Sequence, residues 1–284
     1  MTWRTLVSAE DLAGRLDDPR VRTFDCRFDL MRPQAGRERY LEEHLPGAVF
    51  ADLNSDLAAP PTAVSGRHPL PDPLVFATRL RAWGVDSDSR VVAYDDNNGM
   101  FAARLWWMLR WLGHEAVAVL DGGMRRWQQL DLPLSETVPV TREGSFLARH
   151  RPELAVNADT VLESAADPAR RVLDARAPER YRGEVEPIDR VAGHVPGARN
   201  HPFSGNLAAD GRLLPPDELR QALLRSLDGA APEHAIAMCG SGVTACHVLL
   251  AMEHAGLRGA RLYPGSWSEW SRDPARPVAS GAAP

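Results

Sequence analysis

The sequence predicts an α/β protein made of two similar domains, each built on a mainly parallel sheet flanked by helices. Three observations carry this prediction. The chain has 284 residues, a length typical of about two domains. Short motifs of the first half recur in the second half in the same order. In both halves, segments of strand length alternate with longer segments typical of helices.

Four short motifs indicate the duplication, each recurring at an offset of 143 to 150 residues. Their first copies are residues 6–10, 24–27, 44–48 and 122–127, and their second copies are residues 155–159, 173–176, 194–198 and 265–270. A period this long excludes a solenoid of short repeats. We expect a first domain over residues 1–138, a linker without apolar periodicity over 139–153, and a second domain over 154–284.

Each half shows the same order of elements. The expected strands are residues 21–25, 90–94, 117–120, 171–174, 235–238 and 261–263. The expected longer helices are residues 73–83, 102–112, 216–227 and 244–255. Ser8 and Asn157 are expected N-caps of short helices, and Gly113 and Gly256 suit the left-handed position that ends a helix. Active sites of such sheets lie at the carboxyl ends of the strands.

The basic residues exclude several classes of chemistry. All 33 are arginine, and lysine is absent. A lysine Schiff base, the usual attachment of pyridoxal phosphate and a Walker A phosphate loop are therefore excluded. The formal net charge of −5 and the pI of about 6.0 argue against a nucleic-acid partner.

The remaining composition indicates a reducing, cytoplasmic setting. Three cysteines without a C-x-x-C pair make no disulfide framework, and the nine histidines show no spacing typical of a metal site. Residues 1–5 are followed by Glu10 and Asp11 before any apolar core, so we expect no signal peptide. No run of 18 apolar residues occurs, so we expect no membrane partner.

Cys239 stands where a reactive thiol is expected. It lies between a buried strand and the start of a helix, with Gly240 and Gly242 in the turn, and Asp95 occupies the corresponding place in the first half. Glycines let backbone N–H groups converge, and the helix N-terminus adds a partial positive charge. Both effects favour a negative charge on the sulfur of Cys239.

Two other interpretations of Cys239 are available. A free cysteine is often simply a buried structural residue, although the glycine-rich turn disfavours this. Cysteine phosphatases share the strand–loop–helix geometry but need an arginine six residues after the cysteine. Ala245 stands at that position, so the phosphatase interpretation is disfavoured.

The loop over residues 239–245 resembles the active-site loop of 3-mercaptopyruvate sulfurtransferases, two-domain members of the rhodanese superfamily. The resemblance extends to the segments at residues 179–183, 193–198, 265–270 and 121–123 with Trp127. It implies tandem rhodanese-like domains, of which the first is inactive and the second catalytic. It also implies ping-pong sulfur transfer through a persulfide on Cys239, without metal or organic cofactor, from mercaptopyruvate to a thiol or cyanide.

The resemblance also suggests further site residues. A persulfide-cradling loop is expected from Gly240, Ser241, Gly242, Val243 and Thr244. Arg180 matches the family's carboxylate-binding arginine, and Arg190 is a second candidate in a segment with altered spacing. Either arginine could instead form a structural ion pair.

A Ser–His–Asp relay is found in relatives with the Gly-Ser loop. Ser241 and His68 match its first two members, whereas Asn54 stands at the expected aspartate position, with Asp52 two residues earlier. An asparagine can orient an imidazole but cannot stabilise its charged form as a carboxylate does. His68 could alternatively order a proline-rich loop.

Three hypotheses for the function differ in the sulfur donor or in whether the protein is an enzyme. Thiosulfate-specific relatives carry Arg and Lys after the cysteine, where this chain has Gly240 and Ser241, so we expect a smaller and less basic pocket that favours mercaptopyruvate. A thiosulfate:cyanide sulfurtransferase is the second hypothesis, and a non-catalytic module that binds a sulfur carrier is the third. Thioredoxin is a possible acceptor, and the internal duplication favours a monomer. We expect structural roles for His44, His194, Cys246, Trp106, Trp107 and Trp111.

Overall fold

The computed structural model describes residues 3–283, so Met1 and Thr2 of the segment considered for a signal peptide lie outside it. The chain divides into two units. The first comprises residues 1–59, 70–151 and 209–212, and the second comprises residues 60–69, 152–208 and 213–284. This division differs from contiguous domains, because the proline-rich segment 60–69 groups with the second unit and most of the expected linker groups with the first.

The linker joins the first unit through backbone hydrogen bonds. Gly144 N–H donates to the Arg81 carbonyl oxygen (2.8 Å), and Arg149 N–H donates to the Leu112 carbonyl oxygen (2.8 Å). Both contacts satisfy backbone groups in a segment whose residues 139–151 form no helix or strand.

A parallel five-stranded sheet with the order β1-β5-β4-β2-β3 forms the centre of the first unit. Its strands are β1 (Leu6–Val7), β2 (Val21–Asp25), β3 (Val49–Phe50), β4 (Arg90–Tyr94) and β5 (Val117–Leu120). Its helices are α1 (Ala9–Ala13), α2 (Ala35–Glu42), α3 (Pro73–Ala82), α4 (Ala102–Trp111) and α5 (Gly123–Gln129). Residues of α1 and α5 share one buried apolar cluster with the sheet, including Leu12, Val92 and Trp127.

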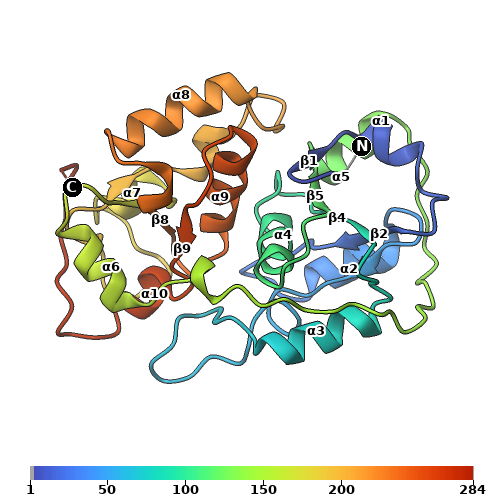
Figure 1. The fold of residues 1–284 in the computed structure, drawn as a ribbon, viewed down its shortest axis with the longest axis horizontal. Helices are drawn as coiled ribbons and strands as arrows, with labels where there is room; N and C mark the ends of the chain where they lie inside the picture. Colours follow the sequence, from blue (N-terminus) through green and yellow to red (C-terminus); the bar gives the residue numbers. More distant parts are fainter. Residues whose placement is uncertain (1–2, 284) are drawn as a thin grey trace. The chain divides into compact units, whose positions relative to one another are not determined.

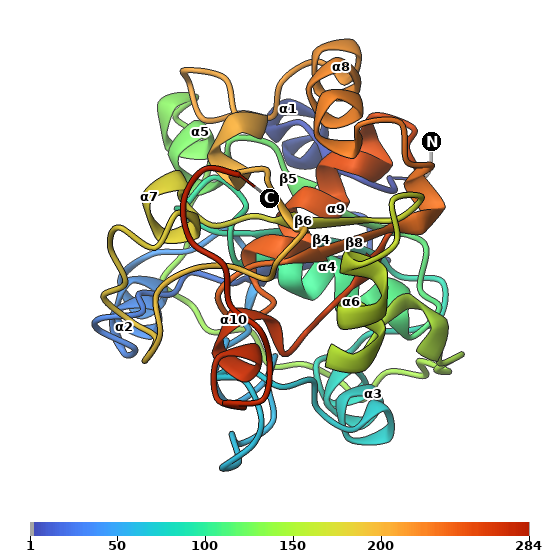
Figure 2. The ribbon, with the colours of Figure 1, turned by 90° about the vertical axis from the view of Figure 1, so that its left-hand side faces the viewer.

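The second unit repeats this plan in a parallel sheet with the order β7-β6-β8-β9. Its strands are β6 (Arg171–Asp174), β7 (Arg199–Asn200), β8 (Ala235–Met238) and β9 (Arg261–Leu262). Its helices are α6 (Ala158–Ala165), α7 (Pro178–Tyr181), α8 (Pro216–Leu227), α9 (Thr244–His254) and α10 (Ser266–Trp270), with short 3-10 turns η1 (Pro152–Leu154), η2 (Phe203–Asn206) and η3 (Pro232–His234). Helices α8 and α9 cover one face of this sheet and α6 and α10 the other (Figures 1 and 2).

The predicted elements are confirmed closely. All the expected strands and longer helices form within one residue of their predicted bounds. The side chain of Ser8 accepts from Asp11 N–H and that of Asn157 accepts from Thr160 N–H, as N-caps do. Gly113 and Gly256 have φ angles of 82° and 74°, the left-handed conformation that ends α4 and α9.

The duplication extends to individual side chains. His44 stacks on Tyr40 at 4.1 Å between ring centroids, and His194 stacks on Tyr181 at 3.8 Å. In each pair the histidine Nδ1 lies within hydrogen-bonding distance of the tyrosine carbonyl oxygen, at 2.6 and 2.8 Å. Both histidines are fully buried, in agreement with the structural role expected for them.

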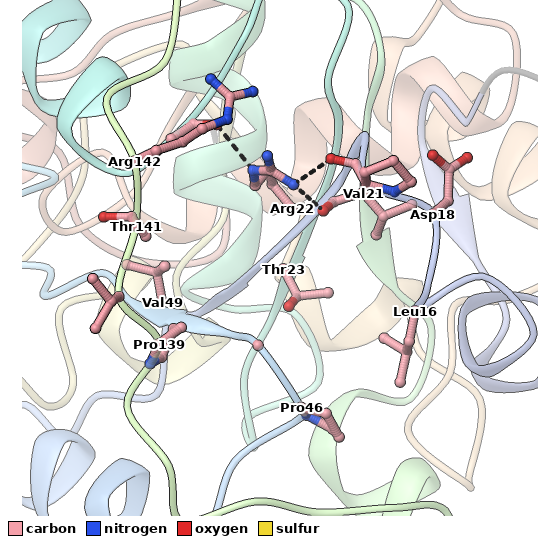
Figure 3. Close-up of a pocket in the computed structure, with 14 residues that line it drawn as sticks. Leu16, Asp18, Val21, Arg22, Thr23, Pro46, Val49, Pro139, Thr141 and Arg142 are labelled. Carbon is pink, nitrogen blue, oxygen red and sulfur yellow. Dashed lines mark hydrogen bonds between the residues drawn. The ribbon is translucent and has the colours of Figure 1, made fainter.

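The pocket in Figure 3 belongs to the first unit and has a volume of about 510 Å³. It is lined by the start of β2 (Val21 and Arg22), and Arg22 Nε there donates to the Gly84 carbonyl oxygen (2.9 Å). Because the strands are parallel, this is the end of the sheet opposite to the carboxyl ends, where α/β sheets place their active sites. Within residues 3–283, no helix is long and apolar enough to cross a membrane.

Candidate active site

Cys239 lies at the carboxyl end of β8, in the loop that leads into α9 (Figure 1). Its side chain is buried, with 2% of the residue exposed. The Gly242 N–H donates to Sγ of Cys239 at 3.1 Å, so the loop turns a backbone dipole toward the sulfur. The loop therefore has the geometry expected for holding a sulfur anion.

The backbone of Cys239 is fixed by the loop after β9. Ser266 Oγ accepts from Cys239 N–H (3.0 Å) and donates to the Tyr263 carbonyl oxygen (2.9 Å). Trp267 N–H donates to the Cys239 carbonyl oxygen (3.0 Å). Ser266 has a φ of 52°, a conformation rare for a residue with a side chain, and its hydroxyl reaches Cys239 from there.

The two glycines of the loop serve different needs. Gly242 has a φ of 76°, and a Cβ at this position would lie 2.5 Å from the Pro264 carbonyl oxygen. A Cβ on Gly240 would instead lie 3.0 Å from Nη2 of Arg67 and 3.5 Å from Nη1 of Arg180. Gly240 thus lets two guanidinium groups approach the loop.

Ser241 and His68 are brought together in the second unit. The Nδ1 of His68 and the Oγ of Ser241 are 2.8 Å apart, and both residues are more than nine-tenths buried. The segment that carries His68 is held by the Arg67 N–H, which donates to Oγ of Ser268 (3.0 Å). This segment therefore contacts the loop that carries Cys239.

Asn54 belongs to the first unit, where its side chain is exposed. Its N–H donates to Oδ1 of Asp52 (2.8 Å), and Ser55 N–H donates to the same oxygen (2.9 Å). Asp52 thus caps a turn in its own unit.

Four charged side chains form a network beside Gly240. Nη2 of Arg180 lies 2.7 Å from Oε1 of Glu186 and 3.2 Å from Oδ2 of Asp189. Nη1 of Arg67 pairs with Oδ1 of Asp189. Burial of Glu186 opposes its ionisation, but the hydrogen bond and charge of Arg180, together with the backbone N–H groups of Ile188 and Asp189, outweigh burial and lower the pKa of Glu186. For Asp189, burial outweighs the nearby arginines and raises the pKa.

The network bears on the expectation of a smaller and less basic pocket. The loop itself carries no cationic side chain. Arg67 and Arg180 approach it from two other segments, and Glu186 and Asp189 offset their charges. Sequence reasoning missed Arg67, although it directly precedes His68, and it missed both acidic partners. Arg190 is exposed, and within residues 3–283 it has no ion pair with this network.

Cys246 lies on α9 and is fully buried. Its thiol donates to the Gly242 carbonyl oxygen (3.2 Å), so it supports the loop from beneath. Cys26 lies in the first unit, where burial raises the pKa of its thiol well above the ordinary range. Both observations fit structural cysteines.

Asp95 occupies the place of Cys239 in the first unit, after β4. Its Oδ1 accepts from Asn97 N–H (2.8 Å) and Gly99 N–H (2.9 Å), and its Oδ2 accepts from Phe101 N–H and Ala102 N–H (both 2.8 Å). The Asp95 carboxylate therefore occupies the anion-binding position of its loop, because four backbone N–H groups donate to it.

Comparison with known proteins agrees with this architecture. Residues 8–130 and 157–273 each match the family model of the rhodanese-like domain. The chain therefore belongs to the rhodanese family, and it has two copies of the domain. The resemblance stated from the loop and its accompanying motifs is confirmed, as is the predicted fold class.

Two relatives that align with this chain over nearly its whole length carry names that refer to different sulfur donors, 3-mercaptopyruvate and thiosulfate. A probable 3-mercaptopyruvate sulfurtransferase of Pseudomonas aeruginosa is 50% identical over 283 residues, which cover 99% of this chain and 100% of that protein. A putative thiosulfate sulfurtransferase of Mycobacterium tuberculosis is 40% identical, covering 99% and 98%. The crystal structure of the Escherichia coli 3-mercaptopyruvate enzyme SseA superposes with a TM-score of 0.80 at 38% identity, covering 95% of this chain and 100% of that one.

Proposed function

We propose that this protein transfers sulfur from 3-mercaptopyruvate to a thiol or cyanide acceptor through a persulfide on Cys239. The observation that carries the proposal is the Cys239 loop, in which a backbone N–H meets the sulfur while the guanidinium of Arg180 lies beside Gly240. A sulfur nucleophile and a group that binds carboxylates are thereby adjacent.

The reaction has two balanced halves. The Cys239 thiolate attacks the thiol sulfur of mercaptopyruvate, an S–S bond forms, and the C–S bond breaks with its electron pair leaving as pyruvate enolate. Protonation of the enolate gives pyruvate. A thiolate or cyanide then attacks the outer sulfur, breaks the S–S bond and regenerates the Cys239 thiolate.

The neighbouring residues supply charge stabilisation and proton transfer. The backbone of Gly240, Ser241, Gly242, Val243 and Thr244 holds the outer sulfur, as an oxyanion hole holds oxygen. The contact between Ser241 and His68 supports a relay that delivers the proton to the enolate. Arg180 binds the donor carboxylate, and Arg190 remains a second candidate for this role.

Intact-mass measurement after treatment with mercaptopyruvate tests the nucleophile. The wild-type protein should gain one sulfur atom, and Cys239→Ser should gain none. Cys246→Ala is the matched control, because it removes a buried thiol of the following helix and should still gain the sulfur. A sulfur gain in Cys239→Ser would contradict the assignment, and its loss in Cys246→Ala would point to Cys246 instead.

Thiosulfate is the second candidate donor. It is favoured by the two guanidinium groups beside Gly240, which could bind a dianion, and by the name of the M. tuberculosis relative. Steady-state kcat/KM with each donor separates the two. A higher value for thiosulfate would overturn the proposed donor.

The setting and partners are part of the same proposal. We infer a cytoplasmic monomer that passes sulfur to a small thiol or to thioredoxin. None of the three cysteines forms a disulfide within residues 3–283, and all three are buried, which supports a reducing compartment. Reduced thioredoxin should accelerate pyruvate release in a turnover assay.

A further inference from the structure

The two guanidinium groups beside Gly240 reach it from separate parts of the second unit. Arg67 comes from the segment 60–69, and Arg180 comes from α7. Both would lie within 3.5 Å of a Cβ on Gly240, so they border the position next to the nucleophile. A donor at Cys239 would therefore meet two positive charges.

One internal carboxylate joins these arginines. Oδ1 of Asp189 pairs with Arg67, and Oδ2 lies 3.2 Å from Nη2 of Arg180. The Asp189 side chain is only 5% exposed, whereas the arginine side chains are 22% and 17% exposed. Asp189 is thus a buried counter-ion, and the arginines keep an accessible side.

The second acidic residue has a different task. Glu186 accepts from Nε and Nη2 of Arg180 (3.2 and 2.7 Å) and also pairs with Arg176. It therefore orients Arg180, whereas Asp189 bridges Arg180 to Arg67. The charges of Arg67, Arg180, Glu186 and Asp189 cancel.

A neutral cluster discriminates between donors by their charge. A monocarboxylate can bind to the accessible side of one arginine while Asp189 retains the other. A dianion such as thiosulfate needs both positive charges and is repelled by the resident carboxylate. Specificity then arises from a repulsive group as well as from an attractive one.

We propose that Asp189 is a specificity-determining residue, which neutralises the Arg67–Arg180 pair and thereby favours a monocarboxylate donor over dianionic thiosulfate. This inference rests on the proposed function, since it concerns the donor that delivers sulfur to Cys239.

The test compares kcat/KM for thiosulfate and mercaptopyruvate in wild-type protein and in Asp189→Asn. The variant keeps the side-chain shape and removes one negative charge. The ratio of thiosulfate to mercaptopyruvate efficiency should rise about tenfold or more. Glu184→Gln is the matched control, because Glu184 lies in the same segment but is exposed and pairs with Arg182 outside the network. The control should leave the ratio unchanged.

Arg67→Gln provides an independent second variant and should lower the ratio, because the dianion loses one of its two cations. An unchanged ratio in folded Asp189→Asn, or in Arg67→Gln, would overturn the inference. Failure of the proposed function looks different: wild-type protein would then form no persulfide with mercaptopyruvate.

Discussion

The loops after β4 and β8 occupy equivalent places in two copies of one fold, yet they do different work. In the first unit, the Asp95 carboxylate accepts four backbone N–H groups and is completely buried. In the second unit, the Cys239 sulfur accepts from Gly242, and the helix begins sooner after the strand. An anion-binding loop of this fold is structural where the chain supplies its own anion, as at Asp95. In the proposed function, the loop at Cys239 supplies a nucleophile in that place.

The largest effect is expected from making the second loop resemble the first. Cys239→Asp should reduce turnover with both donors to background, because a carboxylate cannot carry sulfur and would compete for the N–H groups. Steady-state assays and intact mass measure this. Turnover in folded Cys239→Asp would mean that another residue is the nucleophile.

The stability of the folded protein should depend more on Asp95 than on Cys239, the reverse of the order expected for activity. In the wild-type protein, the N–H groups of Phe101 and Ala102 donate to an oxygen of Asp95. Asp95→Asn replaces one carboxylate oxygen by an NH2 group, which cannot accept from these donors, so the free energy of unfolding should fall by about 3 kcal/mol or more. Cys239→Ser should cost less than about 1 kcal/mol, because one weak acceptor replaces another. Urea unfolding followed by circular dichroism compares the two variants. Equal losses would break the contrast between a structural and a catalytic loop.

The buried Asp–Arg pairs of the two units provide a matched test of the network near Arg180. Arg27 and Arg176 each bind an aspartate at the end of a strand, with closest contacts of 2.7 and 2.6 Å. Replacement of either arginine by lysine removes a two-pronged contact, so each should lower stability by about 1–3 kcal/mol.

Only Arg176 also contacts Glu186, which orients Arg180. Arg176→Lys should therefore raise the KM for mercaptopyruvate by about threefold to tenfold, and Arg27→Lys should leave it unchanged. Donor titrations of both variants decide this. A similar rise in both would show that the effect is one of general stability.

The sequence predicted the fold well because its signals were local and repeated. Strand β8 is a short apolar run, α8 begins with a proline, and the motifs of one half supported those of the other. The prediction that Cys239 is the nucleophile rests on the same local context.

The charged network was not predictable in this way. Arg67 and Asp189 lie far apart in the sequence, and neither has a distinctive neighbour pattern that predicts their pairing. In the sequence, Gly240 indicated that the loop has no positive charge at this position. In the folded protein, Gly240 leaves space for the guanidinium groups of Arg67 and Arg180. Long-range ion pairs depend on the folded geometry, which a single sequence does not contain.

The smallest effect should appear in the pH dependence of donor choice. Burial raises the pKa of Asp189, whereas the pKa of the neighbouring Glu186 is lowered, so Asp189 is the first of the two to protonate as the pH falls. Arginine side chains in general keep their positive charge in this pH range. Protonated Asp189 leaves the cluster with a net positive charge, which favours thiosulfate.

The efficiency ratio of thiosulfate to mercaptopyruvate should therefore rise as the pH is lowered from neutrality toward the raised pKa of Asp189. Asp189→Asn should show a high ratio that is flat over the same range. A slope that persists in Asp189→Asn would assign the pH dependence to another group and would separate donor choice from this carboxylate.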